Sequence, residues 1–166
     1  MESLNYEFGC VMLEIDVQNW SEILSKIDDN DLYKKEDDHY GKQQDPHITI
    51  LYGLDPKISD EEVISIFRES KKEDFNIKIS DINLFENDDY DVLKIEIEDD
   101  LLNKYHRELK KLPNNSKFPE YNGHITIAYL NPGFGEKYVE KNPKIKLKIK
   151  DIVYSKPNGE KIKLGK

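Results

Sequence analysis

The sequence has one cysteine, no long apolar run and no excess of basic residues. A single thiol, Cys10, cannot form an internal disulfide, which excludes a disulfide-stapled secreted domain. No stretch approaches the ~18 apolar residues of a membrane-spanning helix, so we expect no membrane contact. Residues 1–9 lack the basic segment and apolar run of a signal peptide. These absences predict a soluble, cytoplasmic protein.

The charge balance limits the partners that we expect. The chain has 34 acidic and 25 basic residues and a net charge of -9, so it repels long polyanions such as DNA and RNA. A small anionic ligand is still compatible with this charge, because one pocket can be positive on an acidic surface. The 166 residues correspond to one domain, 1–166, which we expect to be a monomer or a weak dimer.

Hydrophobic periodicity predicts strands that alternate with a few short helices. The expected strands are 8–17, 47–53, 75–85, 92–98, 123–130 and 144–155, followed by a last short strand within 160–165. Helices are expected after Asn19 or Ser21, after Ser59, after Asp99 or Asp100, and briefly after the turn 131–135. Residues 28–45 are highly charged and indicate a long loop, either a flap over a site or solvated surface.

The order of these elements repeats. Each half, 8–85 and 92–155, runs strand, helix, loop, HIT strand, helix, strand, and the hexapeptides HITILY and HITIAY agree at five of six positions. The pattern predicts an α/β (α+β) fold of two intertwined lobes related by a pseudo-twofold axis. Mostly antiparallel sheets would then flank a central cleft.

The two HIT strands carry the residues with the clearest chemistry. Side chains on a strand alternate between its faces, so His47 shares a face with Thr49, and His124 shares a face with Thr126. A neutral histidine can take a proton from an attacking oxygen while a protonated one gives a proton to the leaving oxygen. The threonine hydroxyls can hold phosphate oxygens. This combination suits phosphodiester cleavage and needs no metal and no cofactor.

A plainer interpretation treats both segments as ordinary strands, since threonine is a good strand former and one HIT would mean little. Two of only four histidines, however, fall in near-identical hexapeptides at equivalent places in the repeat. We therefore favour the functional interpretation of His47, Thr49, His124 and Thr126 as catalytic residues.

Two H-x-T-x motifs spaced by about half the chain resemble the 2H phosphoesterase superfamily. The resemblance implies a bilobal fold and metal-independent hydrolysis of a small nucleotide by a phosphoric diester hydrolase. The first strand and the segment PHITILYGL also resemble phage anti-CBASS enzymes, which destroy the cyclic di- and trinucleotides of bacterial immune signalling. That likeness implies a phage protein of immune evasion, acting in the host cytoplasm, with a ribose 2′-OH as a possible first nucleophile.

Two alternatives stay open at this point. The substrate can instead be an RNA 2′,3′-cyclic phosphate or a 2′-5′ linkage, as in the 2′-5′ RNA ligase-like enzymes of the same superfamily. A protein of another class would sequester nucleotides without cutting them, although both histidines and both threonines are present.

Aromatic side chains are the candidates for substrate binding. Tyr6 and Phe8 precede the first HIT strand on the expected cleft face, and Tyr154 lies near the end of the last long strand. Each can stack a nucleobase, with core packing as the alternative. His39 lies in the charged loop without a recognisable metal-ligand spacing, so we expect it to be solvated. His106 lies among charged residues on a helix, so we expect it at the surface.

Overall fold

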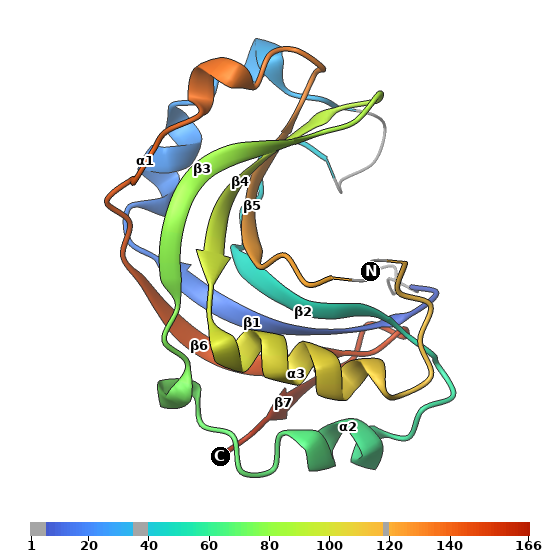
Figure 1. Cartoon of the computed structure of the whole chain (residues 1–166). Helices are drawn as coiled ribbons and strands as arrows, with labels where there is room; N and C mark the ends of the chain where they lie inside the picture. The colour runs from blue at the N-terminus through green and yellow to red at the C-terminus, as the bar shows by residue number, and fades with distance from the viewer. Residues whose placement is uncertain (1–5, 35–39, 118–119) are drawn as a thin grey trace.

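Seven antiparallel strands form one sheet in the computed structural model, which describes residues 6–34, 40–117 and 120–166 (Figure 1). The strand order is β3-β4-β5-β2-β1-β6-β7. The bounds are β1 Gly9–Val17, β2 His47–Leu54, β3 Lys78–Glu86, β4 Asp91–Glu98, β5 His124–Leu130, β6 Leu147–Ser155 and β7 Lys161–Leu164. The predicted α/β fold with a mostly antiparallel sheet is confirmed.

The helices are short and start where the sequence predicts. They are α1 Trp20–Ser25, α2 Asp60–Ile66 and α3 Asp100–Lys110, with 3-10 turns at η1 Asp29–Asp31, η2 Lys72–Asp74 and η3 Glu136–Tyr138. Ser59 and Glu62 form a capping box at α2, and the Asp99 carboxylate accepts from the backbone N–H of Leu101 at α3. The helix expected after residues 131–135 is the turn η3. Within the described residues, no helix has the length and apolar character to cross a membrane.

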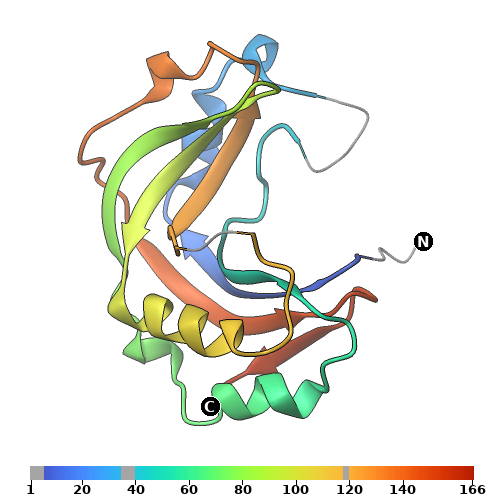
Figure 2. The same ribbon diagram turned by 45° about the vertical axis from the view of Figure 1, so that its right-hand side comes forward.

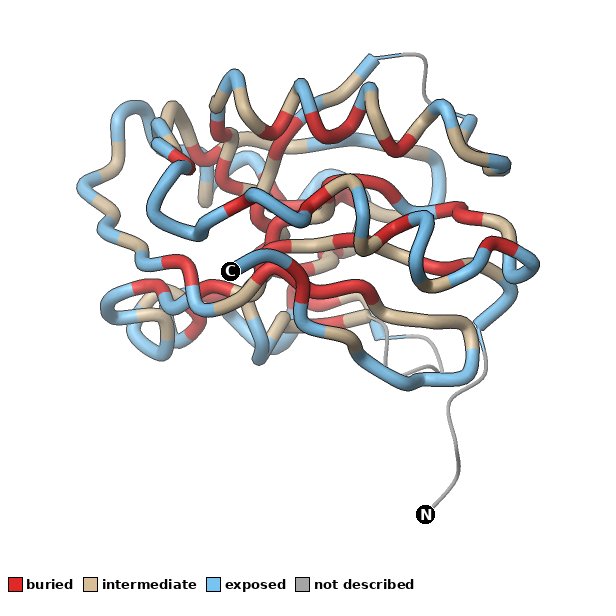
Figure 3. Tube along the Cα trace, turned by 90° about the horizontal axis from the view of Figure 1, so that it is seen from below, coloured by how far each residue is buried: buried red, intermediate tan, exposed pale blue. Residues whose placement is uncertain are grey.

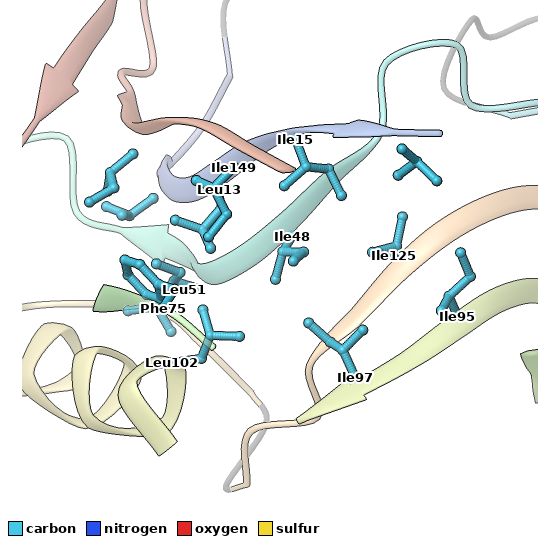
Figure 4. Packing of buried hydrophobic residues seen from close by; sticks show 14 of the residues in the cluster. Leu13, Ile15, Ile48, Leu51, Phe75, Ile95, Ile97, Leu102, Ile125 and Ile149 are labelled. Atoms are coloured by element: carbon cyan, nitrogen blue, oxygen red, sulfur yellow. The ribbon is translucent and has the colours of Figure 1, made fainter. Parts of the chain in front are cut away.

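The sheet is strongly bent into two arms. Figures 1 and 2 show β3, β4 and β5 in one arm and β2, β1 and β6 in the other, with α3 lying along the second arm. Strand alternation sends one face of both arms into the core, where Leu13, Ile48 and Ile125 are each 0% exposed (Figures 3 and 4). The opposite face, here called the site face, carries the polar positions of the same strands.

The two halves of the repeat exchange their last strands. The first half runs β1-α1-β2-α2-β3 and the second runs β4-α3-β5-η3-β6. β3 pairs with β4 of the second half, and β6 pairs with β1 of the first. The halves are therefore intertwined in one sheet, and each arm contains strands from both halves.

β2 and β5 form the seam between the arms, and they pair directly at Ile48 and Ile125. Beyond this point the two strands diverge in their partners. The loop before β2 forms hydrogen bonds with β5, and the loop before β5 forms hydrogen bonds with β2. On β5, the backbone N–H of Gln43 donates to Ile127 O at 2.9 Å, and on β2, Asn115 N–H donates to Gly53 O at 2.7 Å. The described parts of the 28–45 loop are thus ordered along β5, and a wholly solvated loop was the wrong alternative for them.

Candidate active site

The two His-x-Thr pairs meet at the seam of the sheet. Because β2 and β5 are antiparallel and Ile48 faces Ile125, the register sets His47 beside Thr126 and Thr49 beside His124. The isoleucines point into the core, so all four polar side chains lie on the site face, and all four are half-buried. The structure therefore brings together the four residues that the sequence singled out.

Both imidazoles are oriented in the same way. Nδ1 of His47 lies 3.2 Å from the backbone carbonyl oxygen of Asp45, and Nδ1 of His124 lies 2.9 Å from that of Asn122. A carbonyl oxygen only accepts hydrogen bonds, so each Nδ1 carries the proton and donates it. Each Nε2 is then the nitrogen that exchanges a proton with a ligand.

The surroundings of His124 favour its neutral form. Burial is the largest cause and lowers the pKa of His124, whereas the hydrogen bond with the Asn122 carbonyl raises it. The charges of Lys94 and His47 also lower this pKa, each by less than the Asn122 bond raises it. A histidine that stays neutral at physiological pH can accept a proton, which is the task of a general base.

Each histidine is paired with a glutamate on the strand that lies on the far side of its own strand from the seam. Glu14 of β1 is paired with His47, and Glu96 of β4 is paired with His124. The Glu96 carboxylate accepts from the Asn83 side chain at 3.1 Å. Sequence reasoning missed these carboxylates. The similarity of the sequences VMLEI in β1 and VLKIEI in β4 would have indicated a glutamate at the equivalent position of each strand.

One aromatic group stands at the β2 end of the site face. Phe8 meets Tyr52 edge to face, with ring centroids 6.1 Å apart. Tyr6 and Tyr52 are 38% and 50% exposed, so their rings are accessible. Phe8 is half-buried, and Tyr52 is a residue that the sequence analysis did not select.

A second aromatic group stands at the β5 end and consists of Tyr33, Tyr40, Tyr90 and Tyr129. The ring of Tyr129 lies 5.3 Å from those of both Tyr40 and Tyr90, and Tyr33 lies 4.9 Å from Tyr40. A register shift beside each HIT strand brings its sixth residue, Tyr52 or Tyr129, onto the site face. Both hexapeptides, HITILY and HITIAY, end in tyrosine, and this agreement was the sequence feature that could have indicated Tyr52 and Tyr129.

Tyr154 requires a correction. It pairs with Val11 of β1, is 1% exposed and is part of the core, and a Cβ added at Gly9 would lie 2.8 Å from its ring. Its ring is not available to a nucleobase, and the expected substrate contact at Tyr154 is wrong.

Neither Cys10 nor His106 joins the site as a reactive group. Burial raises the pKa of the Cys10 thiol to about 12, despite a hydrogen bond with Thr49, so it stays protonated. His106 is 7% exposed, and Nδ1 lies 2.8 Å from the Ile50 carbonyl oxygen, which corrects its expected surface position. His39 lies outside the described residues.

Two cavities are separate from the four site side chains. The larger, about 990 Å³, lies between α2 and α3 and includes Ser70, Tyr105 and Glu108 in its lining. The smaller, about 200 Å³, is lined by Glu96, Tyr121 and Asn122 and borders the site. Across residues 6–34, 40–117 and 120–166, His, Cys, Asp and Glu side chains form no group of three that could hold a metal ion.

Comparison with known proteins supports the resemblance based on the two motifs. A family model described as the 2'-5' RNA ligase superfamily matches residues 15–152, which include both HIT strands. Among curated proteins, a search finds no match to the chain. The matched segment covers most of the sequence, and the chain belongs to the 2'-5' RNA ligase superfamily.

Proposed function

We propose that this protein hydrolyses a phosphodiester bond in a small oligonucleotide, and that cyclic di- or trinucleotides are its substrates. The observation that carries the proposal is the pair of His-x-Thr motifs side by side on one face of the sheet. Membership of the 2'-5' RNA ligase superfamily supports phosphodiesterase or ligase chemistry in general. Within this chemistry, we propose hydrolysis rather than ligation, and a cyclic rather than a linear substrate.

The four side chains can perform the reaction without a further group from the protein. Nε2 of one histidine takes the proton of the attacking hydroxyl, either a ribose 2′-OH or water, as its oxygen bonds to phosphorus. The bond from phosphorus to the leaving oxygen breaks, and Nε2 of the other histidine supplies the proton to that oxygen. Thr49 and Thr126 donate hydrogen bonds to non-bridging oxygens and stabilise the charge that builds there.

The two aromatic groups support a substrate with more than one base. They flank the histidines on the site face, and stacking on an aromatic ring contributes about 1–3 kcal/mol per base. Tyr6 and Phe8, with Tyr52, would hold one base. The net charge of -9 disfavours long RNA, which favours a short ligand. The likeness to phage anti-CBASS enzymes makes cyclic oligonucleotides of bacterial immune signalling the first substrates to test.

A second candidate function is cleavage of 2′-5′ linkages or of RNA 2′,3′-cyclic phosphates. The description of the matching family supports it directly. The same four side chains would perform the same proton transfers on these substrates, so the site geometry favours neither candidate. A substrate panel separates them.

The decisive experiment incubates the protein with cyclic dinucleotides, cyclic trinucleotides, 2′-5′ oligoadenylate and RNA ending in a 2′,3′-cyclic phosphate, all with a chelator. We expect linear products from the cyclic oligonucleotides. His47→Ala and His124→Ala should each lower kcat by about 10²–10⁴-fold while the thermal midpoint stays near that of the wild type.

Tyr52→Ala tests the aromatic contacts, and Phe134→Ala, at an equally exposed ring in the turn before η3, is its control. We expect a higher KM for the first variant only. Tight binding with the cyclic ligand recovered unchanged would replace hydrolysis by sequestration. Loss of activity in chelator would overturn the metal-free mechanism.

A further inference from the structure

The residues that β1 and β4 place beside the two His-x-Thr pairs match at the histidines and differ at the threonines. Each histidine has a glutamate beside it on the outer strand. The residue beside Thr49 on β1 is Met12, whereas the residue beside Thr126 on β4 is Lys94. Beside the threonines the two halves therefore differ by one positive charge, whereas Glu14 of the first half is ion-paired with Lys161 at 3.2 Å.

The ammonium of Lys94 is held by a neutral group. Its Nζ donates to Asn83 Oδ1 at 2.7 Å, and Asn83 Nδ2 in turn donates to Glu96 Oε2 at 3.1 Å. Among the ion pairs of the described residues, none includes Lys94. Lysine has three N–H donors, and Asn83 uses one, so the others are available to an anion.

Partial burial strengthens the attraction of Lys94 for an anion. The side chain is half-buried, and this desolvation lowers the pKa of Lys94, with a smaller opposite effect from Glu96. An incoming phosphate compensates a desolvated ammonium better than a fully hydrated one. The position beside Thr126 is where such a phosphate would meet the site.

We propose that Lys94 binds a non-bridging oxygen of the scissile phosphate beside Thr126, and that its charge makes His124 the general base and His47 the general acid. This inference rests on the proposed phosphodiester chemistry and assigns the roles that the symmetric motifs leave open. In the step, Nε2 of His124 takes the proton from the attacking hydroxyl as the new P–O bond forms. Nε2 of His47 gives its proton to the leaving oxygen as the old P–O bond breaks.

Two of the charged groups around His124, Lys94 and His47, lower its pKa, each by less than burial does. Lys94 and Glu96 face it from β4, and His47 faces it from β2. Glu96 also contacts Asn83, which bridges it to Lys94. The positive charge of Lys94 opposes a second one on His124, so the imidazole is kept ready to accept a proton. On β1 the equivalent neighbour of Thr49 is Met12, which exerts no such effect.

The kinetic test is Lys94→Met, which gives the second half the residue found in the first. We expect kcat/KM to fall by about 10²–10³-fold, as for loss of one donor to a developing charge. The acidic limb of the pH profile, which reports the base, should move to higher pH because His124 loses a positive neighbour. Lys94→Arg should retain the limb and most of the rate.

Lys148→Met is the matched control, because Lys148 is an exposed lysine on β6. Its replacement changes the net charge of the protein by the same amount as Lys94→Met. It should keep the wild-type rate and pH profile. The proposal is overturned if Lys94→Met behaves like this control. It is also overturned if the rate falls without a shift of the acidic limb, or if the basic limb moves instead.

A measurement without substrate separates this inference from the proposed function. Histidine side chains are labelled with nitrogen-15, and the His124 imidazole is assigned by its absence in His124→Ala. We expect its titration midpoint to rise in Lys94→Met and to stay unchanged in Lys148→Met. An unchanged midpoint in both variants would refute the assignment even if the enzyme is active. A raised midpoint in a protein that cuts no phosphodiester would refute only the proposed function.

Discussion

At the scale of single residues, His106 ties α3 to the strand that carries the first motif. His106 is 7% exposed, its Nδ1 lies 2.8 Å from the Ile50 carbonyl oxygen, and its ring packs against that of Tyr121 at an angle of 34°, with centroids 4.8 Å apart. Tyr121 in turn donates to the Thr49 carbonyl oxygen at 2.8 Å. Two backbone carbonyls of β2 are thus hydrogen-bonded by this pair of side chains.

His106→Ala should destabilise the fold by about 2–4 kcal/mol, because it leaves a cavity and an unpaired carbonyl. The measurement is urea unfolding at neutral pH. Arg107→Ala, at the next and exposed position of α3, should stay within about 0.5 kcal/mol of the wild type. An equal loss of stability in both variants would contradict a packing role for His106.

The residues that sequence reasoning placed correctly are those whose strand alternates regularly. His47, Thr49, His124 and Thr126 precede the register shifts of their strands, so simple alternation predicted their common face. Tyr52 and Tyr129 follow the shifts and were missed for that reason. His106 was misplaced because charged neighbours in sequence do not reveal which helix face meets the sheet.

At the scale of elements, residue Asp31 anchors the described part of the 28–45 loop. Its carboxylate accepts from Lys137 Nζ at 2.7 Å and from the Tyr138 hydroxyl at 2.5 Å, both in η3. Leu32, next to it, is bridged to Leu130 of β5. The loop before β2 is therefore bonded to β5 and η3, which both belong to the second half of the repeat.

The hydrogen bond from Lys137, followed by that from Tyr138, lowers the pKa of Asp31 in the folded protein. A carboxyl with a lowered folded pKa adds stability above its unfolded value, about 3.9, and that stability is lost as the pH falls through the folded value. We expect Asp31→Asn to melt below the wild type at pH 7, with the difference shrinking toward pH 3. Melting curves at several pH values test this, and a difference independent of pH would contradict it.

Most elements could be predicted from their sequence, because alternation and capping are local. The capping box at Ser59 and the cap at Asp99 set the starts of α2 and α3. The 28–45 loop could not be placed, because its order depends on bonds to β5 and η3, which lie about a hundred residues away. Long-range pairing of this kind leaves no period in the sequence.

At the scale of the whole molecule, the site exists only where the two halves join. The repeat in sequence predicted two similar, intertwined units that bring their motifs together, but it did not indicate that β3 and β6 are the exchanged strands. The junction is narrow, since β2 and β5 pair directly at Ile48 and Ile125 and both side chains are 0% exposed. Packing of these two residues therefore fixes the distance between the two motifs.

The last prediction compares two core substitutions of the same kind. Ile48→Ala at the seam and Ile152→Ala in β6, two strands away from β2, should each cost about 2–5 kcal/mol of stability. Because small misplacements of reacting groups lower rates steeply, Ile48→Ala should also lower kcat by about 10–100-fold. Ile152→Ala should keep kcat near the wild type when both are assayed well below their melting temperatures. Equal activities in the two variants would show that the motifs are held by the arms of the sheet and not by the seam.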